Sequence, residues 1–244
     1  MARYADNADD GIRQRSGWLI PLGVFLITFA LAALFLLFYL APAPPSFFRE
    51  QISYTSRTDV VALKVHGHKF FIPANYLKYR SDRQGGERAD IKLVAIFPDM
   101  QGYSGWDDSS FRDNAVDSPV VEMLIHDDAV MLSERDWLKR IYMPYIANPK
   151  GASGPFGLTQ YAFRTDSGYH GEDLFVGQGA QGPMVIQCVR YSQQVPSPNC
   201  HRELPIAHGV ALGYRFKRAH LAKWLEIGNS TEKLVQSFRM KPVH

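Results

Sequence analysis

Hydrophobic residues are distributed along this chain in two different ways. Over residues 19–41 they form one run that contains no charged residue, and the uncharged stretch extends over residues 16–48. At ~1.5 Å per residue, a helix over this run would be about 35 Å long, enough to cross a hydrocarbon core of roughly 30 Å. The pattern predicts a single transmembrane helix over residues 18–41, preceded by a tail over residues 1–17.

A cleaved signal peptide is the alternative interpretation of this run. The apolar region of such a peptide is about 7–15 residues long. The small residues that could form a cleavage site, Ala41-Pro42-Ala43, are followed by Pro44, whose rigid ring should hinder cleavage. An uncleaved anchor is therefore the favoured interpretation.

The orientation of the anchor follows from the basic residues that flank it. Arg3, Arg13 and Arg15 lie in the tail, whereas Arg49 and Arg57, on the other side, are further from the apolar run. Basic residues close to a span favour the cytoplasmic side. We expect an inner-membrane protein of a Gram-negative bacterium, with the N-terminus inside and the C-terminal domain in the periplasm.

Beyond a Pro-rich linker over residues 42–58, the apolar residues fall in short runs that are typical of strands. One tight hairpin is expected at His66-Gly67-His68. Strands are predicted over residues 60–65, 69–72, 91–97, 120–126, 158–165, 184–191 and 210–216.

Helices are fewer. Ser133-Glu134-Arg135-Asp136 resembles a capping box and predicts a helix that continues to about Met143. Apolar residues at helical spacing predict a C-terminal helix over residues 220–238, which Gly228 could break into two. The fold class is therefore α+β: an N-terminal single transmembrane helix, then a β-rich antiparallel mixed domain over residues 59–244 with a C-terminal helix.

The two cysteines agree with export of this domain. Cys188 and Cys200 are 12 positions apart and are separated by a Pro/Ser/Asn-rich turn region. An even number of cysteines in an exported domain favours a disulfide. We therefore predict a bridge between Cys188 and Cys200.

Charge is unevenly distributed although the net charge is only +3, which gives no indication of nucleic-acid binding. Residues 99–134 contain nine acidic residues and one basic residue, whereas residues 215–244 contain seven basic and two acidic residues. The two regions are expected to face each other or water. An acidic docking surface for a basic partner is the alternative.

No catalytic constellation emerges from the motifs. Residues 177–182 match GxGxxG, but Pro183 and a strand follow them, so no helix N-terminus is available for a pyrophosphate. A hairpin loop is the simpler interpretation. Ser104 and Ser153 lack the second glycine of a GxSxG elbow, and Asp107-Asp108 beside Trp106 could form a glycosidase pair only by chance proximity.

Metal sites are also not indicated. His66 and His68 would share one face of an extended chain, but Gly67 makes a turn more plausible and a turn would separate the two rings. His126-Asp127-Asp128 places three ligand types in a row, which rarely reach one ion. The sequence predicts no catalytic residue, no cofactor and no metal.

Aromatic residues near loops are the strongest indication of a binding role. Aromatic side chains are common anchors of protein interfaces, although they also fill cores. The candidate partner-binding residues are Tyr103, Trp106, Asp107, Asp108, Phe111 and Phe156.

These observations predict a non-catalytic, single-pass envelope protein that contacts the lipid bilayer through residues 18–41. Its periplasmic domain would bind another envelope protein, and no nucleic acid. The layout resembles that of single-pass envelope proteins of Gram-negative bacteria that serve as accessory subunits or immunity proteins, although no motif supports a family. Two alternatives remain: a subunit of a membrane complex held mainly through its transmembrane helix, and an envelope hydrolase acting on glycan or lipid through Ser104, Asp107, Asp108 or His126.

Overall fold

The computed structural model describes residues 17–40, 51–130, 132–180 and 182–241. The chain forms two compact units, residues 1–50 and residues 51–244, which are considered separately. The expected tail lies almost entirely outside the described residues, as does most of the Pro-rich linker.

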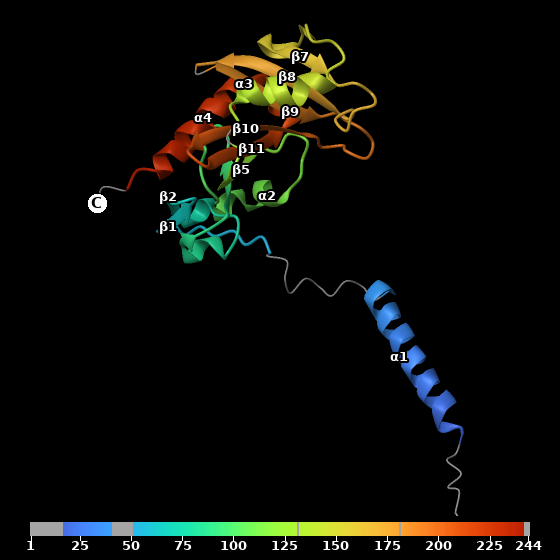
Figure 1. Ribbon diagram of the computed structural model, residues 1–244. Helices are drawn as coiled ribbons and strands as arrows, with labels where there is room; N and C mark the ends of the chain where they lie inside the picture. The colour runs from blue at the N-terminus through green and yellow to red at the C-terminus, as the bar shows by residue number, and fades with distance from the viewer. Residues whose placement is uncertain (1–16, 41–50, 131, 181, 242–244) are drawn as a thin grey trace, which may run out of the picture. The chain divides into compact units, whose positions relative to one another are not determined.

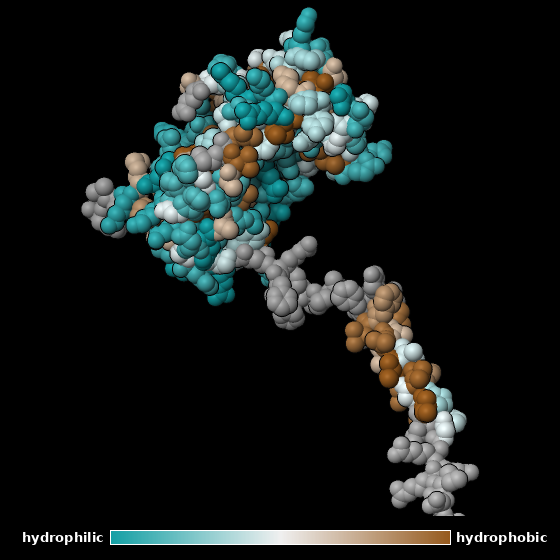
Figure 2. Space-filling view, viewed as in Figure 1, coloured by the Kyte–Doolittle hydropathy of each residue, from teal (hydrophilic) through white to brown (hydrophobic). Residues whose placement is uncertain are grey.

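In the described part of the first unit, residues 19–40 form a helix, α1 (Leu19–Leu40), at the place where the sequence predicts one. Large apolar side chains such as Phe25, Leu31 and Leu34 are exposed along it. Figure 2 shows that hydrophobic residues gather on this helix. Over the described part of the chain, however, no helix combines the length and the apolar character needed to cross a membrane. The transmembrane assignment of residues 18–41 is therefore not confirmed.

The second unit is built on an eight-stranded sheet of order β4-β5-β11-β10-β9-β8-β7-β6, in which all neighbours are antiparallel. A smaller sheet of order β2-β1-β3 accompanies it. The strands are β1 (Val60–Val65), β2 (His68–Pro73), β3 (Gly86–Glu87), β4 (Asp90–Ile96), β5 (Val120–Asp127), β6 (Ala152–Ser153), β7 (Thr159–Ala162), β8 (Glu172–Gly179), β9 (Gly182–Val189), β10 (Asn199–Ala207) and β11 (Val210–Lys217).

Helical segments connect the strands and close the chain (Figure 1). A 3₁₀ turn (Gly105–Asp107) leads into α2 (Asp108–Arg112). A short α-helix, α3 (Glu134–Asp136), continues as a π-helical segment (Trp137–Tyr142) and a 3₁₀ turn (Met143–Tyr145). At the C-terminus a 3₁₀ segment (Arg218–Lys223) precedes α4 (Trp224–Phe238). The fold class of the domain, α+β with antiparallel sheets and a C-terminal helix, is confirmed.

The main core lies on one face of the large sheet, between it, the small sheet and α4. Helix α4 is amphipathic: it buries Trp224, Ile227, Val235 and Phe238 at helical spacing against this core. The helix is continuous through Gly228, so the break that the sequence allowed at this residue does not occur. The position favours a residue without a Cβ, because a Cβ on Gly228 would lie 2.4 Å from Met184 Cε and 3.0 Å from the Tyr214 hydroxyl.

Most of the predicted strands are present within a few residues of their expected ends, including the hairpin at His66-Gly67-His68. Strand β7 is shorter than the expected strand over 158–165. Strand β10 was not predicted. The N-cap half of the predicted capping box is confirmed, since the Ser133 hydroxyl accepts a hydrogen bond from the Asp136 amide at 3.2 Å. The Asp136 carboxylate accepts from the Ser133 hydroxyl at 2.7 Å, whereas in a capping box it would accept from the Ser133 amide.

The large sheet is divided between β9 and β10. These strands pair at only two positions, Cys188 opposite Cys200 and Gln187 opposite His201, and then separate. In the gap, the Glu134 carboxylate accepts the Val185 amide proton at 2.8 Å. The sheet therefore consists of two halves, β4-β5-β11-β10 and β9-β8-β7-β6, that are joined over a short distance.

Candidate protein-binding face

The second face of the large sheet is covered over one half and left open over the other. On the β8-β9 half, Leu174 and Val185 are buried in a second apolar cluster together with Ile146, Phe163 and residues of the 137–143 segment. On the other half, directly opposed residues form the row Lys92, Leu124, Gly213 and Glu203 across β4, β5, β11 and β10. We call this second half the open face.

The open face contains a groove of about 310 Å³. Leu124 and Gly213 lie at its centre, between Tyr79 and Lys92 on one side and Glu203 on the other. The Lys92 ammonium lies 5.2 Å from the centroid of the Tyr79 ring, which holds both side chains at the edge of the groove.

A carboxylate with two cationic partners closes one end of the groove. Glu122 accepts hydrogen bonds from Lys78 at 2.9 Å and from Arg215 Nε at 2.8 Å. Burial raises the pKa of Glu122, but Lys78 and then Arg215 outweigh this effect and hold the pKa below its usual range. The expected meeting of the acidic and basic regions therefore occurs here, since Glu122 and Arg215 belong to one region each.

Histidines lie at the edge of the same face. His201 is exposed beside the groove, and desolvation by its surroundings lowers its pKa, an effect that the charge of Glu203 partly opposes. Glu203 Oε1 also lies 3.2 Å from His126 Nε2. The contact between Glu203 and His126 joins β10 to β5 across β11.

An aromatic loop adjoins the open face. A smaller cavity of about 70 Å³ connects the two, because Glu122 and Arg215 line it together with Phe111. Phe111 is buried and packs against Tyr54 and Tyr103, whose rings stack on each other with centroids 5.2 Å apart. Desolvation raises the pKa of Tyr54 to about 12. We call the segment of residues 103–112 the aromatic loop.

The most exposed aromatic side chain of the domain is at the tip of this loop. Trp106 is 97% exposed and lies on the 3₁₀ turn that precedes α2. The turn is supported by hydrogen bonds from the Ser104 hydroxyl to Asp107 (2.5 Å) and from the Tyr103 hydroxyl to Asp108 (2.7 Å). Arg112 donates to Asp108 and lowers the pKa of that carboxyl group. Trp106 is therefore exposed on a turn whose backbone is held by these side-chain hydrogen bonds.

The structure brings together five of the six predicted partner-binding residues and separates the sixth. Tyr103, Trp106, Asp107, Asp108 and Phe111 share the aromatic loop. Phe156 is exposed in another loop, where its carbonyl accepts a hydrogen bond from Trp224 Nε1 at 3.2 Å. Whether any of them contacts a partner stays a prediction.

The residues considered for catalysis are not assembled into one site. The Ser104 hydroxyl donates a hydrogen bond to Asp107, and among the described residues no histidine is hydrogen-bonded to it. His126 lies instead at the end of β5 beside Glu203. His66 contacts Asp127 at 3.2 Å, whereas His68 is bonded to the His208 carbonyl at 3.0 Å. Among the described residues, no three His, Cys, Asp or Glu side chains are grouped closely enough to hold a metal ion.

The GxGxxG motif forms the β8-β9 hairpin, in which Gly179 is opposite Gly182. Its first two glycines make room for packing. A Cβ at Gly177 would lie 2.3 Å from the Trp224 ring, and one at Gly179 would lie 2.7 Å from Met184 Sδ. The motif therefore reflects the docking of α4 and the strand packing.

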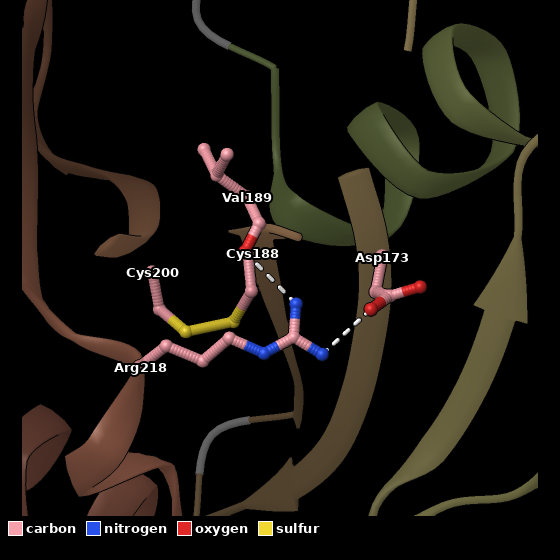
Figure 3. The surroundings of a disulfide bond; sticks show 5 residues. All are labelled: Asp173, Cys188, Val189, Cys200 and Arg218. Atoms are coloured by element: carbon pink, nitrogen blue, oxygen red, sulfur yellow. Dashed lines mark hydrogen bonds and ion pairs between the residues drawn. A yellow bond between two sulfur atoms is a disulfide. The ribbon is translucent and has the colours of Figure 1, made fainter. Parts of the chain in front are cut away.

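The predicted disulfide is confirmed. Cys188 and Cys200 are directly opposite each other on β9 and β10 and are fully buried. Figure 3 shows the Arg218 guanidinium beside the bridge, bonded to the Val189 carbonyl at 2.9 Å and to Asp173 at 2.6 Å. The bridge joins the two halves of the large sheet at the point where they pair.

Two solved structures resemble this chain. One is Smlt3025, an immunity protein of the type IV secretion system of Stenotrophomonas maltophilia, with a TM-score of 0.54 and 17% identity over 79% of this chain and 98% of that chain. The other is the iron-regulated outer membrane lipoprotein FrpD of Neisseria meningitidis, with a TM-score of 0.48 and 20% identity over 78% and 99% of the two chains.

The likeness to Smlt3025 concerns the fold alone, because the identity is low. It covers nearly the whole length of that protein. No family model matches this chain, and no curated protein sequence matches it.

Sequence reasoning missed the open face. The residues that form its groove come from four strands and from Lys78 and Tyr79, and one of these strands, β10, was not predicted. The only local signal was Gly213, a glycine in the middle of an otherwise alternating strand. Such a glycine often marks a place where another group approaches the backbone.

Proposed function

We propose that this chain is a non-catalytic protein-binding protein of the bacterial cell envelope, of the accessory-subunit or immunity type. The observation that carries the proposal is Trp106, an exposed tryptophan on a braced loop next to the open face. Tryptophan is enriched among the residues that dominate binding energy at protein interfaces. An immunity protein among the structural neighbours agrees with this role.

The proposal includes the location that the sequence predicts. A buried disulfide supports an oxidising compartment outside the cytoplasm. The exposed apolar side chains of α1 support attachment of the chain to the inner membrane. The arginines that precede the apolar run in the sequence support an N-terminus inside. A C-terminal alkaline phosphatase fusion should be active and a C-terminal green fluorescent protein fusion dark. The reverse result would overturn the location.

The binding role is tested by capture from native membranes. The full-length protein, crosslinked in its host and purified in mild detergent, should retain a specific protein partner. Trp106→Ala should weaken capture by about 30-fold, which corresponds to the ~2 kcal/mol typical of a dominant interface residue. Tyr191→Ala, which removes another highly exposed aromatic ring outside this face, is the matched control and should leave capture unchanged.

Two outcomes would contradict the role as stated. Equal capture by Trp106→Ala and wild type would remove the aromatic loop from the interface. A second variant, in which residues 19–40 are replaced by polyleucine, tests the helix instead. Loss of the partner with this variant alone would favour a complex subunit held through α1.

A further inference from the structure

The groove of the open face is created by a glycine that the fold itself does not require. Gly213 lies in the middle of β11, and a Cβ built on it would meet no atom within 4 Å. Its backbone is also outside the positive-φ region in which glycine is favoured. A glycine inside a strand weakens that strand. Its effect here is to leave a hollow between the side chains that flank it.

The hollow has the character of a pocket for one large side chain. Its volume of about 310 Å³ is at the lower limit of ligand pockets. Leu124 lies directly opposite Gly213, and the Tyr79 ring stands at the edge, so the centre is apolar and the rim is charged. Pockets of this kind, with an apolar centre sealed from water by a polar rim, receive the anchor residues of protein interfaces.

The rim carries more positive than negative charge at one end. Lys78 and Arg215 share the single carboxylate of Glu122. The Arg215 side chain is still 55% exposed. An incoming acidic group could therefore pair with Arg215 without displacing Glu122.

We propose that the groove over Gly213 binds an aromatic side chain of the protein partner, with a neighbouring acidic side chain of that partner paired with Arg215. The inference rests on the proposed function, because it names the part of the partner that the open face recognises. It adds a second anchor point to the one that Trp106 supplies.

Blocked peptides test the pocket without a known partner. The probe is acetyl-Gly-Phe-Glu-Gly-amide, added to isotope-labelled full-length protein in detergent micelles. We expect saturable shifts of the Gly213 and Leu124 amide resonances. The same peptide with Ala in place of Phe, or with Lys in place of Glu, should bind at least tenfold more weakly.

Gly213→Val fills the hollow and should weaken binding of the probe at least tenfold, with a melting temperature that is unchanged or higher. Gly168→Val is the matched control, since Gly168 is also surrounded by open space but does not line the groove. Probe binding that survives Gly213→Val would overturn the proposal. Absence of binding by the probe at millimolar concentration, or equal binding of all three peptides, would also overturn it.

Partner capture separates this inference from the proposed function. If Gly213→Val captures as much partner as wild type while Trp106→Ala captures little, the pocket is not used and the protein-binding role stands. If both variants lose the partner and both remain folded, the two anchor points act on one interface.

Discussion

At the scale of single residues, the most consequential side chain of the core is Arg202. It is 4% exposed on β10 and donates to Glu134 from Nε (2.8 Å) and Nη2 (2.6 Å), and to Glu232 from Nη1 (2.6 Å). Glu134 in turn holds the Val185 amide where β9 and β10 separate. One guanidinium therefore connects β10, α3 and α4 across the divided sheet.

Arg202→Leu should lower the free energy of unfolding by about 3–5 kcal/mol, because it leaves the Glu134 and Glu232 carboxylates without their buried cation. Chemical denaturation of the full-length protein measures the loss. Arg164→Leu removes an exposed ion pair with Asp166 and is the control, for which we expect a change below about 1 kcal/mol. A loss of the same small size for Arg202→Leu would show that the ion cluster is not structural.

Residues also show the limit of prediction from sequence. Tyr103, Trp106 and Phe111 were equivalent as aromatic residues in a loop. The structure distinguishes them, because Tyr54, which is distant in sequence, covers Phe111 and leaves Trp106 in solvent. Gly177 is a similar case. Its role is to accommodate the Trp224 ring, and no local pattern reveals which ring will approach it.

At the scale of elements, the sequence predicted those strands and helix ends that depend on neighbouring residues in the chain. Short apolar runs predicted β1 and β5, alternation predicted β11, and the Ser133 cap predicted the start of α3. Strand β10 was not recognised in the sequence because a charged residue, Arg202, occupies a buried position and because Pro205 lies within the strand. Pro205 is tolerated because β9 has already separated there and the β10-β11 register shifts between Pro205 and Ala207.

The disulfide is the element-scale feature with the clearest prediction. Because β9 and β10 pair at two positions only, the bridge supplies much of their connection. Cys188→Ala/Cys200→Ala should lower the free energy of unfolding by about 2–4 kcal/mol through the larger entropy of the unfolded chain. Hydrogen exchange should show the largest loss of protection in β9 and β10, and a smaller loss in β4 and β5.

A control variant tests whether these effects are specific to the place where β9 and β10 pair. Replacing the exposed Ser153 by Ala in β6, at the far edge of the same sheet, should change neither stability nor exchange. If the cysteine double variant loses protection equally in all strands, the sheet behaves as one cooperative unit and its division between β9 and β10 has no energetic consequence.

At the scale of the whole molecule, ionisable groups set the pH range of stability. On the acid side the relevant groups are Asp173 and Glu122. Burial raises the pKa of Asp173, but Arg218 and Arg190 outweigh it and hold the pKa below its usual range. Lys78 and Arg215 act on Glu122 in the same way. Both carboxylates therefore lose protons more readily in the folded state than in the unfolded state.

The sign on the acid side follows from linkage. Above the unfolded-state pKa values of about 4, both carboxylates are charged in both states and their stabilisation is complete. As the pH falls below about 4, the unfolded state binds protons first, and the stabilisation is lost progressively until the folded-state pKa values are passed. Asp173→Asn should therefore be less stable than wild type at pH 7 and should show a flatter decline below pH 4.

On the alkaline side the groups are tyrosines that desolvation keeps protonated. It raises the pKa of Tyr54, Tyr142 and Tyr214 to about 12 each. Their stabilisation is complete below the ordinary tyrosine value of about 10 and is lost as the pH rises through 10 toward 12, because the unfolded state releases these protons first. Below about pH 6.5 the unfolded state also protonates His201 first, because burial lowers the pKa of that residue in the folded state. Thermal denaturation at a series of pH values should therefore give a plateau from about pH 7 to pH 9 that declines on both sides.

Absorbance at 295 nm reports tyrosinate directly and tests the alkaline decline by an independent route. Tyr54, Tyr142 and Tyr214 should titrate late, close to or together with unfolding. Tyr76 and Tyr103, whose pKa values are also raised, should add to this late phase. Tyr142→Phe, which keeps the ring and removes the hydroxyl bonded to Gln187, should remove one late proton and leave the acid decline unchanged. If all twelve tyrosines of the chain titrate together near pH 10 while the protein remains folded, the burial of the Tyr54, Tyr142 and Tyr214 hydroxyls does not control its alkaline stability.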